Sequence, residues 1–180
     1  MSRFIKQAIR FLYPASLQGQ MFILVFLVVF GALFVSGAIF TTFIGNLSKA
    51  EIGRRALDIA HTVAMMPIVH TVLEKGNDPQ GELAALAGQV RKRTGAQFVV
   101  IADRGSRRFS HPDPEKIGKR FVGGDETAAL DQGKAYVSEA VGTLGPSLRS
   151  IVPILNDKDT VIGFVSVGYL QTKVLETVKD

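Results

Sequence analysis

A long uncharged stretch near the N-terminus most limits what this chain can fold into. Residues 21–44, MFILVFLVVFGALFVSGAIFTTFI, contain no charged residue and almost no polar one. The stretch is longer than the roughly 20 residues that a helix needs to cross a bilayer. A cleaved signal peptide is the alternative, but its apolar core usually has only about 7–15 residues and a small-residue cleavage site, which is missing here. We therefore expect an uncleaved transmembrane helix.

The segment before this stretch is short and basic. Residues 1–20 place apolar side chains on one helical face and Arg3, Lys6 and Arg10 on another. This pattern fits an amphipathic helix at the membrane interface as well as it fits a solvated basic tail. Lys and Arg are balanced on the two sides of the apolar stretch, so the positive-inside rule does not decide the orientation. A short basic N-terminus before a long domain favours cytoplasmic residues 1–20 and an extracytoplasmic domain over residues 45–171.

The composition excludes several classes of function. The net charge is +5, but the basic residues are scattered rather than gathered on one face, so nucleic acid is not an expected partner. The chain has no cysteine, which removes disulfides, thiol nucleophiles and Cys-ligated metals. No nucleophile elbow or pair of buried carboxylates can be read from the sequence. We therefore expect no catalytic residue, no metal and no cofactor in these residues.

The residues after the apolar stretch repeat with a helical period. An apolar stripe at three- and four-residue intervals predicts a helix after a short break, with Asn46 or Ser48 as its N-cap. Pro67 predicts a kink or a restart of this helix. Residues 78–95 predict another helix, with Pro79 in its first turn.

The period then changes from helical to strand-like. Residues 98–103 predict a β-strand, and residues 107–111, RRFSH, predict its partner in a hairpin. A short helix over residues 123–133, capped by Asp125, is expected next. Three further strands and an exit helix are expected over residues 134–141, 147–155, 161–170 and 172–180. Strands packed by helices at one end of the domain indicate an α+β fold with a five-stranded antiparallel sheet.

Three motifs in the second half point to a known family. SHP…IG…F.GGDE, GTLGPSLR and IGFVSVGY occur in that order within residues 98–169. This region resembles the extracytoplasmic sensor domain of citrate/C4-dicarboxylate sensor histidine kinases (CitA/DcuS type), and the likeness is weaker over residues 46–95. The resemblance implies a PAS-like fold and a dimeric receptor of the bacterial inner membrane, with its sensor domain in the periplasm.

The family pattern also implies further parts beyond the sensor domain. A second transmembrane helix, a cytoplasmic PAS domain and a kinase come next in that family, and the kinase signals to a response regulator. The chain ends at Asp180, where the second span is expected to begin. We therefore expect these residues to be the non-catalytic sensor portion of a longer histidine kinase.

The resemblance implies a binding site for a small carboxylate. The positions carried over are Arg108, His111, Phe121, Gly142, Thr143, Leu144, Arg149 and Ser166. Arginine suits such a ligand because its planar guanidinium forms two parallel hydrogen bonds with a carboxylate. Without the resemblance, Arg108 and Arg149 would be interpreted as solvated strand residues and His111 as a surface histidine. A histidine near two arginines is either neutral or protonated by the charge of the ligand.

Two positions depart from the citrate-type pattern. Ile151 stands where citrate sensors carry a lysine, and Val100 stands where they carry a threonine. The ligand therefore stays open between citrate, malate, fumarate and succinate. We assign residues 123–125, Gly-Gly-Asp, to helix capping rather than to phosphate binding.

The expected function is to bind a small di- or tricarboxylate and to transmit a piston-like step across the membrane. A membrane-anchored PAS-like interaction module without a small-molecule ligand is the alternative. An anchored hydrolase is a third possibility.

Overall fold

The computed structural model describes residues 17–171, apart from the side chains of residues 41–46 and 48. The chain divides into two units, residues 1–46 and residues 47–180. Most of the expected amphipathic segment 1–20 and all of the expected exit helix 172–180 therefore lie outside the described residues.

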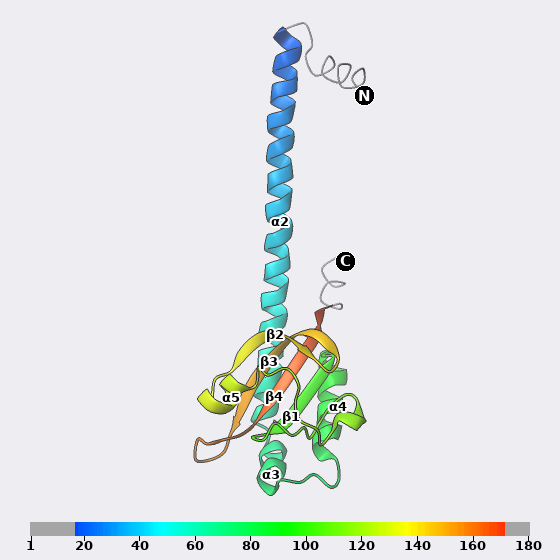
Figure 1. Ribbon diagram of the computed structural model, residues 1–180, viewed down its shortest axis with the longest axis vertical. Helices are drawn as coiled ribbons and strands as arrows, with labels where there is room; N and C mark the ends of the chain where they lie inside the picture. The colour runs from blue at the N-terminus through cyan, green and yellow to red at the C-terminus, as the bar shows by residue number, and fades with distance from the viewer. Residues whose placement is uncertain (1–16, 172–180) are drawn as a thin grey trace. The chain divides into compact units, whose positions relative to one another are not determined.

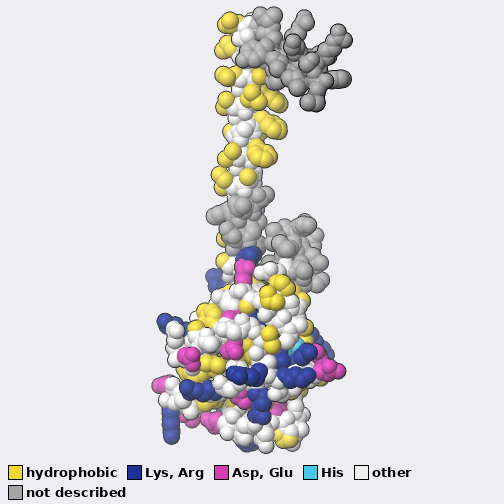
Figure 2. Space-filling view, in the orientation of Figure 1, with side chains coloured by type: hydrophobic (Ala, Val, Ile, Leu, Met, Phe, Trp, Pro, Cys, Tyr) yellow, Lys and Arg dark blue, Asp and Glu magenta, His cyan; other side chains and the backbone are white. Residues whose placement is uncertain are grey.

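Helix α2 (Leu17–Ala64) contains the long apolar stretch. Its part Leu17–Phe40 is unburied throughout, and among the described residues it is the single helix long and apolar enough to span a membrane unaided. Figure 2 shows hydrophobic side chains along this part of the helix. The expected break with an N-cap at Asn46 or Ser48 is wrong, because α2 continues through both residues. Gly45 is the weakest helix former there, and one glycine does not end a helix.

The kink predicted at Pro67 is confirmed. Helix α3 (Pro67–Lys75) is bent by 65° from the end of α2. Helix α4 (Glu82–Thr94) starts later than expected, so Pro79 lies before its first turn. The carboxylate of Asp78 accepts hydrogen bonds from the first two backbone N–H groups of α4, at 2.8 and 2.9 Å. This side-chain cap, rather than the proline, sets the start of α4.

An antiparallel sheet forms the centre of the second unit (Figure 1). Its described strands are β1 (Phe98–Asp103), β2 (Tyr136–Gly142), β3 (Gly145–Leu155) and β4 (Val161–Leu170). Their order is β1-β4-β3-β2. The α+β class is confirmed, and the expected strands at residues 98–103 and 161–170 have the predicted bounds.

The expected fifth strand over residues 107–111 is wrong. This segment forms only two isolated bridges and no ladder in the described structure. Its Ser110 hydroxyl accepts from the N–H of Ile101 at 2.8 Å and donates to the carbonyl of Val99 at 3.2 Å. The Ser110 side chain thus bonds two backbone groups at the edge of β1 that would bond to the backbone of a neighbouring strand in a regular ladder. Ser106, with φ of 62°, also bends the chain just before the segment.

The two faces of the sheet carry different layers. Val165 and Val167 of β4 pack in a core with α2, α3 and α4, whereas Phe164 belongs to the core on the other face. Strand residues alternate between faces, so Arg149 and Ile151 of β3 share the face of Phe164. Helix α5 (Thr127–Gln132) packs against that face through Ala129, which is fully buried. The candidate site lies on this second face.

Candidate ligand-binding site

A small cavity lies between β1, the segment 107–122, the β2–β3 turn and β3. Its lining residues are Phe98, Val100, Arg108, His111, Phe121, Val122, Gly142, Thr143, Leu144, Gly145, Ser147 and Arg149. Seven of the eight residues predicted for the site are therefore brought together. The cavity volume is about 20 Å³, which is room for about one water molecule. A diacid enters only if part of this wall moves.

Ser166 is the predicted residue that does not line the cavity. It is fully buried on β4, between its cross-strand neighbours Val100 and Ile151. Its hydroxyl has no hydrogen-bond partner among the described residues. Ser166 therefore lies in the sheet beneath the site rather than in its wall.

Arg108 is a buried cation without an ion-pair partner. Its residue is 3% exposed, and its Nε donates to the backbone carbonyl of Lys119 at 3.2 Å. No ion pair of Arg108 occurs within residues 17–171. Burial lowers the pKa of Arg108, and the nearby carboxylate of Asp113 opposes this only in part. Because an unpaired buried charge is expensive, this position favours an anion.

His111 joins two sides of the cavity. Its Nδ1 lies 2.9 Å from the backbone nitrogen of Asp113, and its Nε2 lies 2.9 Å from Oγ1 of Thr143. Nδ1 also lies 3.0 Å from the carbonyl oxygen of Asp113. The proton of the neutral ring is therefore either on Nε2, facing Thr143, or on Nδ1, facing that carbonyl. Burial is the main cause that lowers the pKa of His111, and the charges of Arg108 and Lys116 lower it further. A hydrogen bond with the Asp113 backbone and the charge of Asp113 oppose this lowering of the pKa only in part. The imidazole is therefore neutral near pH 7.

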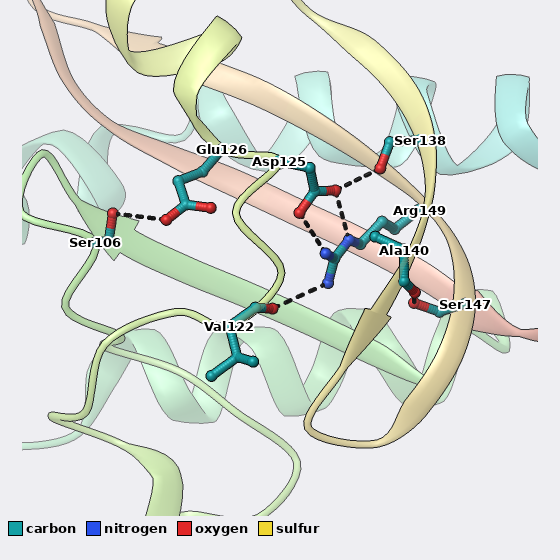
Figure 3. A network of polar contacts seen from close by, with 8 residues as sticks. All are labelled: Ser106, Val122, Asp125, Glu126, Ser138, Ala140, Ser147 and Arg149. Atoms are coloured by element: carbon teal, nitrogen blue, oxygen red, sulfur yellow. Dashed lines mark hydrogen bonds and ion pairs between the residues drawn. The ribbon is translucent and has the colours of Figure 1, made fainter.

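Arg149 is more deeply buried than Arg108, at 2% exposed, but its charge is paired (Figure 3). Its Nε donates to Oδ2 of Asp125 at 2.8 Å, and its Nη2 pairs with Oδ1 of the same carboxylate. Its Nη1 donates to the carbonyl of Val122 at 3.4 Å. The ring of Phe121 lies under the guanidinium, 4.9 Å from ring centroid to Cζ. These contacts hold the guanidinium plane in one orientation at the cavity wall.

Asp125 has a role that was not predicted from the sequence. It was expected to cap the short helix, but Glu126 is the N-cap of α5 and no side chain caps its N–H groups. The Asp125 carboxylate instead holds Arg149 and accepts a hydrogen bond from the hydroxyl of Ser138. Asp125 and Arg149 are 24 positions apart, so no local pattern reveals the pair.

Gly123 explains why the chain carries glycines before Asp125. Its φ is 146°, a conformation that other residues rarely adopt. A Cβ at this position would overlap the guanidinium of Arg149. The glycine therefore lets the backbone pass directly over the arginine side chain, and the assignment of residues 123–125 to helix capping is wrong.

Comparisons with known proteins converge on one kind of domain. The family model described as "Single cache domain 3" matches residues 48–180. The sensor protein CitS of Halalkalibacterium halodurans is 34% identical over 95% of this chain and 32% of its own length. The sensor histidine kinase DcuS of Escherichia coli K12 is 32% identical over 93% of this chain and 30% of its own length. The chain thus spans about a third of the length of these curated relatives.

The solved structures agree with this result. The crystal structure of the E. coli DcuS sensor domain superposes with a TM-score of 0.69 at 32% identity. The match covers 74% of this chain and 99% of that domain. The second unit therefore has the PAS-like fold of a sensor domain.

Proposed function

This chain belongs to the single cache domain 3 family, and from that membership we propose that it senses a small dicarboxylate outside the cytoplasm. Its relatives are sensor domains of two-component sensor kinases, so the role in sensing follows from the family. The ligand, the orientation in the membrane and the way the signal travels are our proposals.

Arg108 is the observation that carries the proposal. It is a buried cation in a cavity wall, without an ion pair in the described residues and with a pKa lowered by its burial. A ligand carboxylate there would form charge-assisted hydrogen bonds with the guanidinium and remove an uncompensated charge. His111 lines the same cavity and adds a ring nitrogen, Nε2, that can form a hydrogen bond with the ligand.

The number of cations favours two carboxylates over three. Arg149 is the second arginine at the cavity, and its rigid fork is suited to the other end of a diacid. Ile151, where a lysine would serve a tricarboxylate, is fully buried and apolar. Lys119 and Arg120 are exposed, and neither lines the cavity. A third carboxylate would therefore be desolvated without a partner, which is unfavourable.

The signal would pass between the two ends of the sensor domain, where α2 enters it and where the chain leaves it after β4. Lys49 of α2 pairs with Glu139 of β2 at 3.0 Å, and the side chain of Gln171, just after β4, donates to the same Glu139 at 2.8 Å. Entry and exit are thus linked through β2, whose Ser138 contacts the site through Asp125. We propose that ligand binding shifts the exit relative to α2 in a piston-like step, in a homodimer whose kinase part signals to a response regulator.

A binding panel tests the proposed function. The 180-residue chain in detergent micelles is titrated with succinate, fumarate, malate and citrate in a calorimeter, and with acetate as the monocarboxylate control. We expect the dicarboxylates to bind at least as well as citrate, and acetate to bind weakly. Citrate binding a hundredfold tighter than malate would overturn the dicarboxylate assignment. Heat from none of the ligands would favour the anchored interaction module instead.

A further inference from the structure

Asp125 occupies the same guanidinium edge that a ligand carboxylate would use. It contacts both Nε and Nη2 of Arg149, which is the side-on arrangement that gives two parallel bonds (Figure 3). The Asp125 side chain is 15% exposed and that of Arg149 is 2% exposed, so the pair is shielded from water. A carboxylate of the chain itself therefore already neutralises one of the two arginines.

The charges at the cavity are consequently unequal. Arg108 has no ion pair in the described structure, whereas Arg149 is paired with Asp125. His111 is neutral near pH 7, because burial lowers its pKa. The cavity as it stands has one uncompensated positive charge, enough for one carboxylate.

The cavity is also closed by the segment that carries Asp125. Val122 lines the cavity, and its carbonyl accepts from Nη1 of Arg149 at 3.4 Å. Gly123 runs directly over the guanidinium. A volume of about 20 Å³ does not hold a four-carbon diacid, so part of the wall has to move, and the Val122 backbone is a part of the wall that contacts Arg149 directly.

We propose that Asp125 is an internal competitor that the second carboxylate of the ligand displaces from Arg149. When one carboxylate replaces another, Arg149 stays paired. The exchange therefore costs little of the ion-pair energy of Arg149. The Asp125 side chain is already 15% exposed when it is paired, so it can be solvated once it is released. This inference rests on the proposed function and adds a specificity-determining residue to it.

The exchange explains how the site could respond to diacids and not to monoacids. A monocarboxylate is satisfied by Arg108 alone and leaves Asp125 on Arg149. A dicarboxylate reaches both arginines and frees residues 122–126 together with α5, which comes directly after them. Only the second carboxylate therefore supplies a difference in affinity between the closed and released forms, and only such a difference shifts their populations.

Ser138 provides the cleanest test because its substitution changes no charge. Its hydroxyl donates to Asp125 but does not line the cavity. Ser138→Ala weakens the hold on Asp125 while both members of the ion pair stay in place. If Asp125 competes with the ligand, succinate should bind roughly three- to tenfold tighter to this variant, because the apparent affinity is the intrinsic affinity multiplied by the fraction of protein in the open, binding-competent form, and the substitution raises that fraction. If Asp125 instead positions Arg149 for the ligand, succinate should bind more weakly, which would overturn the proposal.

A charge-matched pair gives a second, independent readout. Asp125→Asn and Glu126→Gln each remove one negative charge from neighbouring residues, and only Asp125 contacts Arg149. We expect succinate to bind about tenfold or more tightly to Asp125→Asn than to Glu126→Gln, again because the closed fraction is removed. Equal affinities for the two variants would contradict the proposal. Thermal unfolding of both variants verifies that they are folded. If Asp125→Asn is unfolded, the succinate affinity of Ser138→Ala alone tests the proposal.

Movement of the segment can be followed directly. The chain has neither cysteine nor tryptophan, so Thr127→Cys, at an exposed position in α5, carries a single fluorophore. Succinate should change its emission in the otherwise unchanged chain, and acetate at saturation should not. An unchanged emission with succinate bound would overturn the exchange while leaving the proposed function intact. Absence of succinate binding to the unsubstituted chain would instead overturn both.

Discussion

His111 and Thr143 close the cavity between them, with 2.9 Å from Nε2 of the ring to Oγ1 of the threonine. His111 belongs to the segment that carries Arg108, and Thr143 belongs to the turn between β2 and β3. This contact connects the segment with Arg108 to the strand with Arg149. The protein thus makes part of this connection with its own side chains.

Arg108→Ala should abolish binding with little effect on stability. Loss of a buried charge partner for a ligand weakens binding by about 2–5 kcal/mol, at least 30-fold in Kd. Stability should change little, because Arg108 has no ion pair in the described structure. Calorimetry with succinate and thermal unfolding measure the two effects.

Arg107→Ala is the matched control for this variant. Arg107 is exposed, pairs with Asp103 at 3.2 Å and does not line the cavity. Succinate affinity should therefore be unchanged in Arg107→Ala. Equal affinities of the Arg107 and Arg108 variants would place the ligand elsewhere.

Arg149→Ala should lose both binding and stability. The substitution leaves the Asp125 carboxylate largely buried without its cation, which destabilises a protein by about 3–5 kcal/mol. The double variant Arg149→Ala/Asp125→Ala should recover most of that stability in urea unfolding but none of the succinate binding. An Arg149→Ala variant as stable as the unsubstituted chain would contradict the ion pair.

Affinity for fumarate should be nearly constant above pH 7 and should rise as the pH falls below about 6.5, the ordinary pKa of histidine. Fumarate is used because its carboxyl groups are more acidic than those of succinate and stay ionised at the low end of the range. Burial lowers the pKa of His111, so its protonated form appears below that value, and an anionic ligand favours the protonated ring. Calorimetry with fumarate from about pH 5.5 to 8.5, on both sides of the ordinary histidine pKa, measures the profile.

His111→Gln is the control for the pH profile, because glutamine donates a hydrogen bond but does not titrate in this range. Its profile should be flat, and an identical rise in both proteins would exclude His111 as the titrating group. The free energy of unfolding provides an independent check on the direction of the His111 pKa shift. The unfolded chain takes up the proton first, so a lowered pKa in the folded state makes the protein less stable as the pH falls through about 6.5.

Succinate should change the distance between the entry and the exit of the sensor domain. Spin labels at Asp58→Cys, exposed on α2, and at Leu175→Cys, beyond the described residues, report this distance. We expect a shift on saturation, and a smaller shift in Glu139→Ala, which loses the contacts with both Lys49 and Gln171. The piston-like step is wrong if the distance in the unsubstituted chain is the same with and without succinate.

Elements with strong periodicity could be predicted from the sequence. β1 and β4 are rich in Val, Ile and aromatic residues and are bounded by turn residues, and both have their expected bounds. The bend at Pro67 follows from the geometry of proline, which is local. The expected fifth strand was wrong because one hydroxyl, that of Ser110, bonds the edge of β1. No sequence period records such a side-chain contact.

In the site too, features set by local motifs could be predicted, whereas a contact between distant residues could not. The motifs bring seven of the predicted residues to one cavity, since they follow the order of the strands and turns around it. The pairing of Asp125 with Arg149 was missed because Gly-Gly-Asp before a short helix also fits a cap. Which of the two uses of Asp125 prevails depends on the tertiary packing of residues 122–126 over β3.

A crystal structure of the chain with succinate tests the central claim most directly. The account predicts one carboxylate on the guanidinium of Arg108, the other on Nε and Nη2 of Arg149, and Asp125 turned away from the arginine. Succinate bound without contact to either Arg108 or Arg149 would contradict the account.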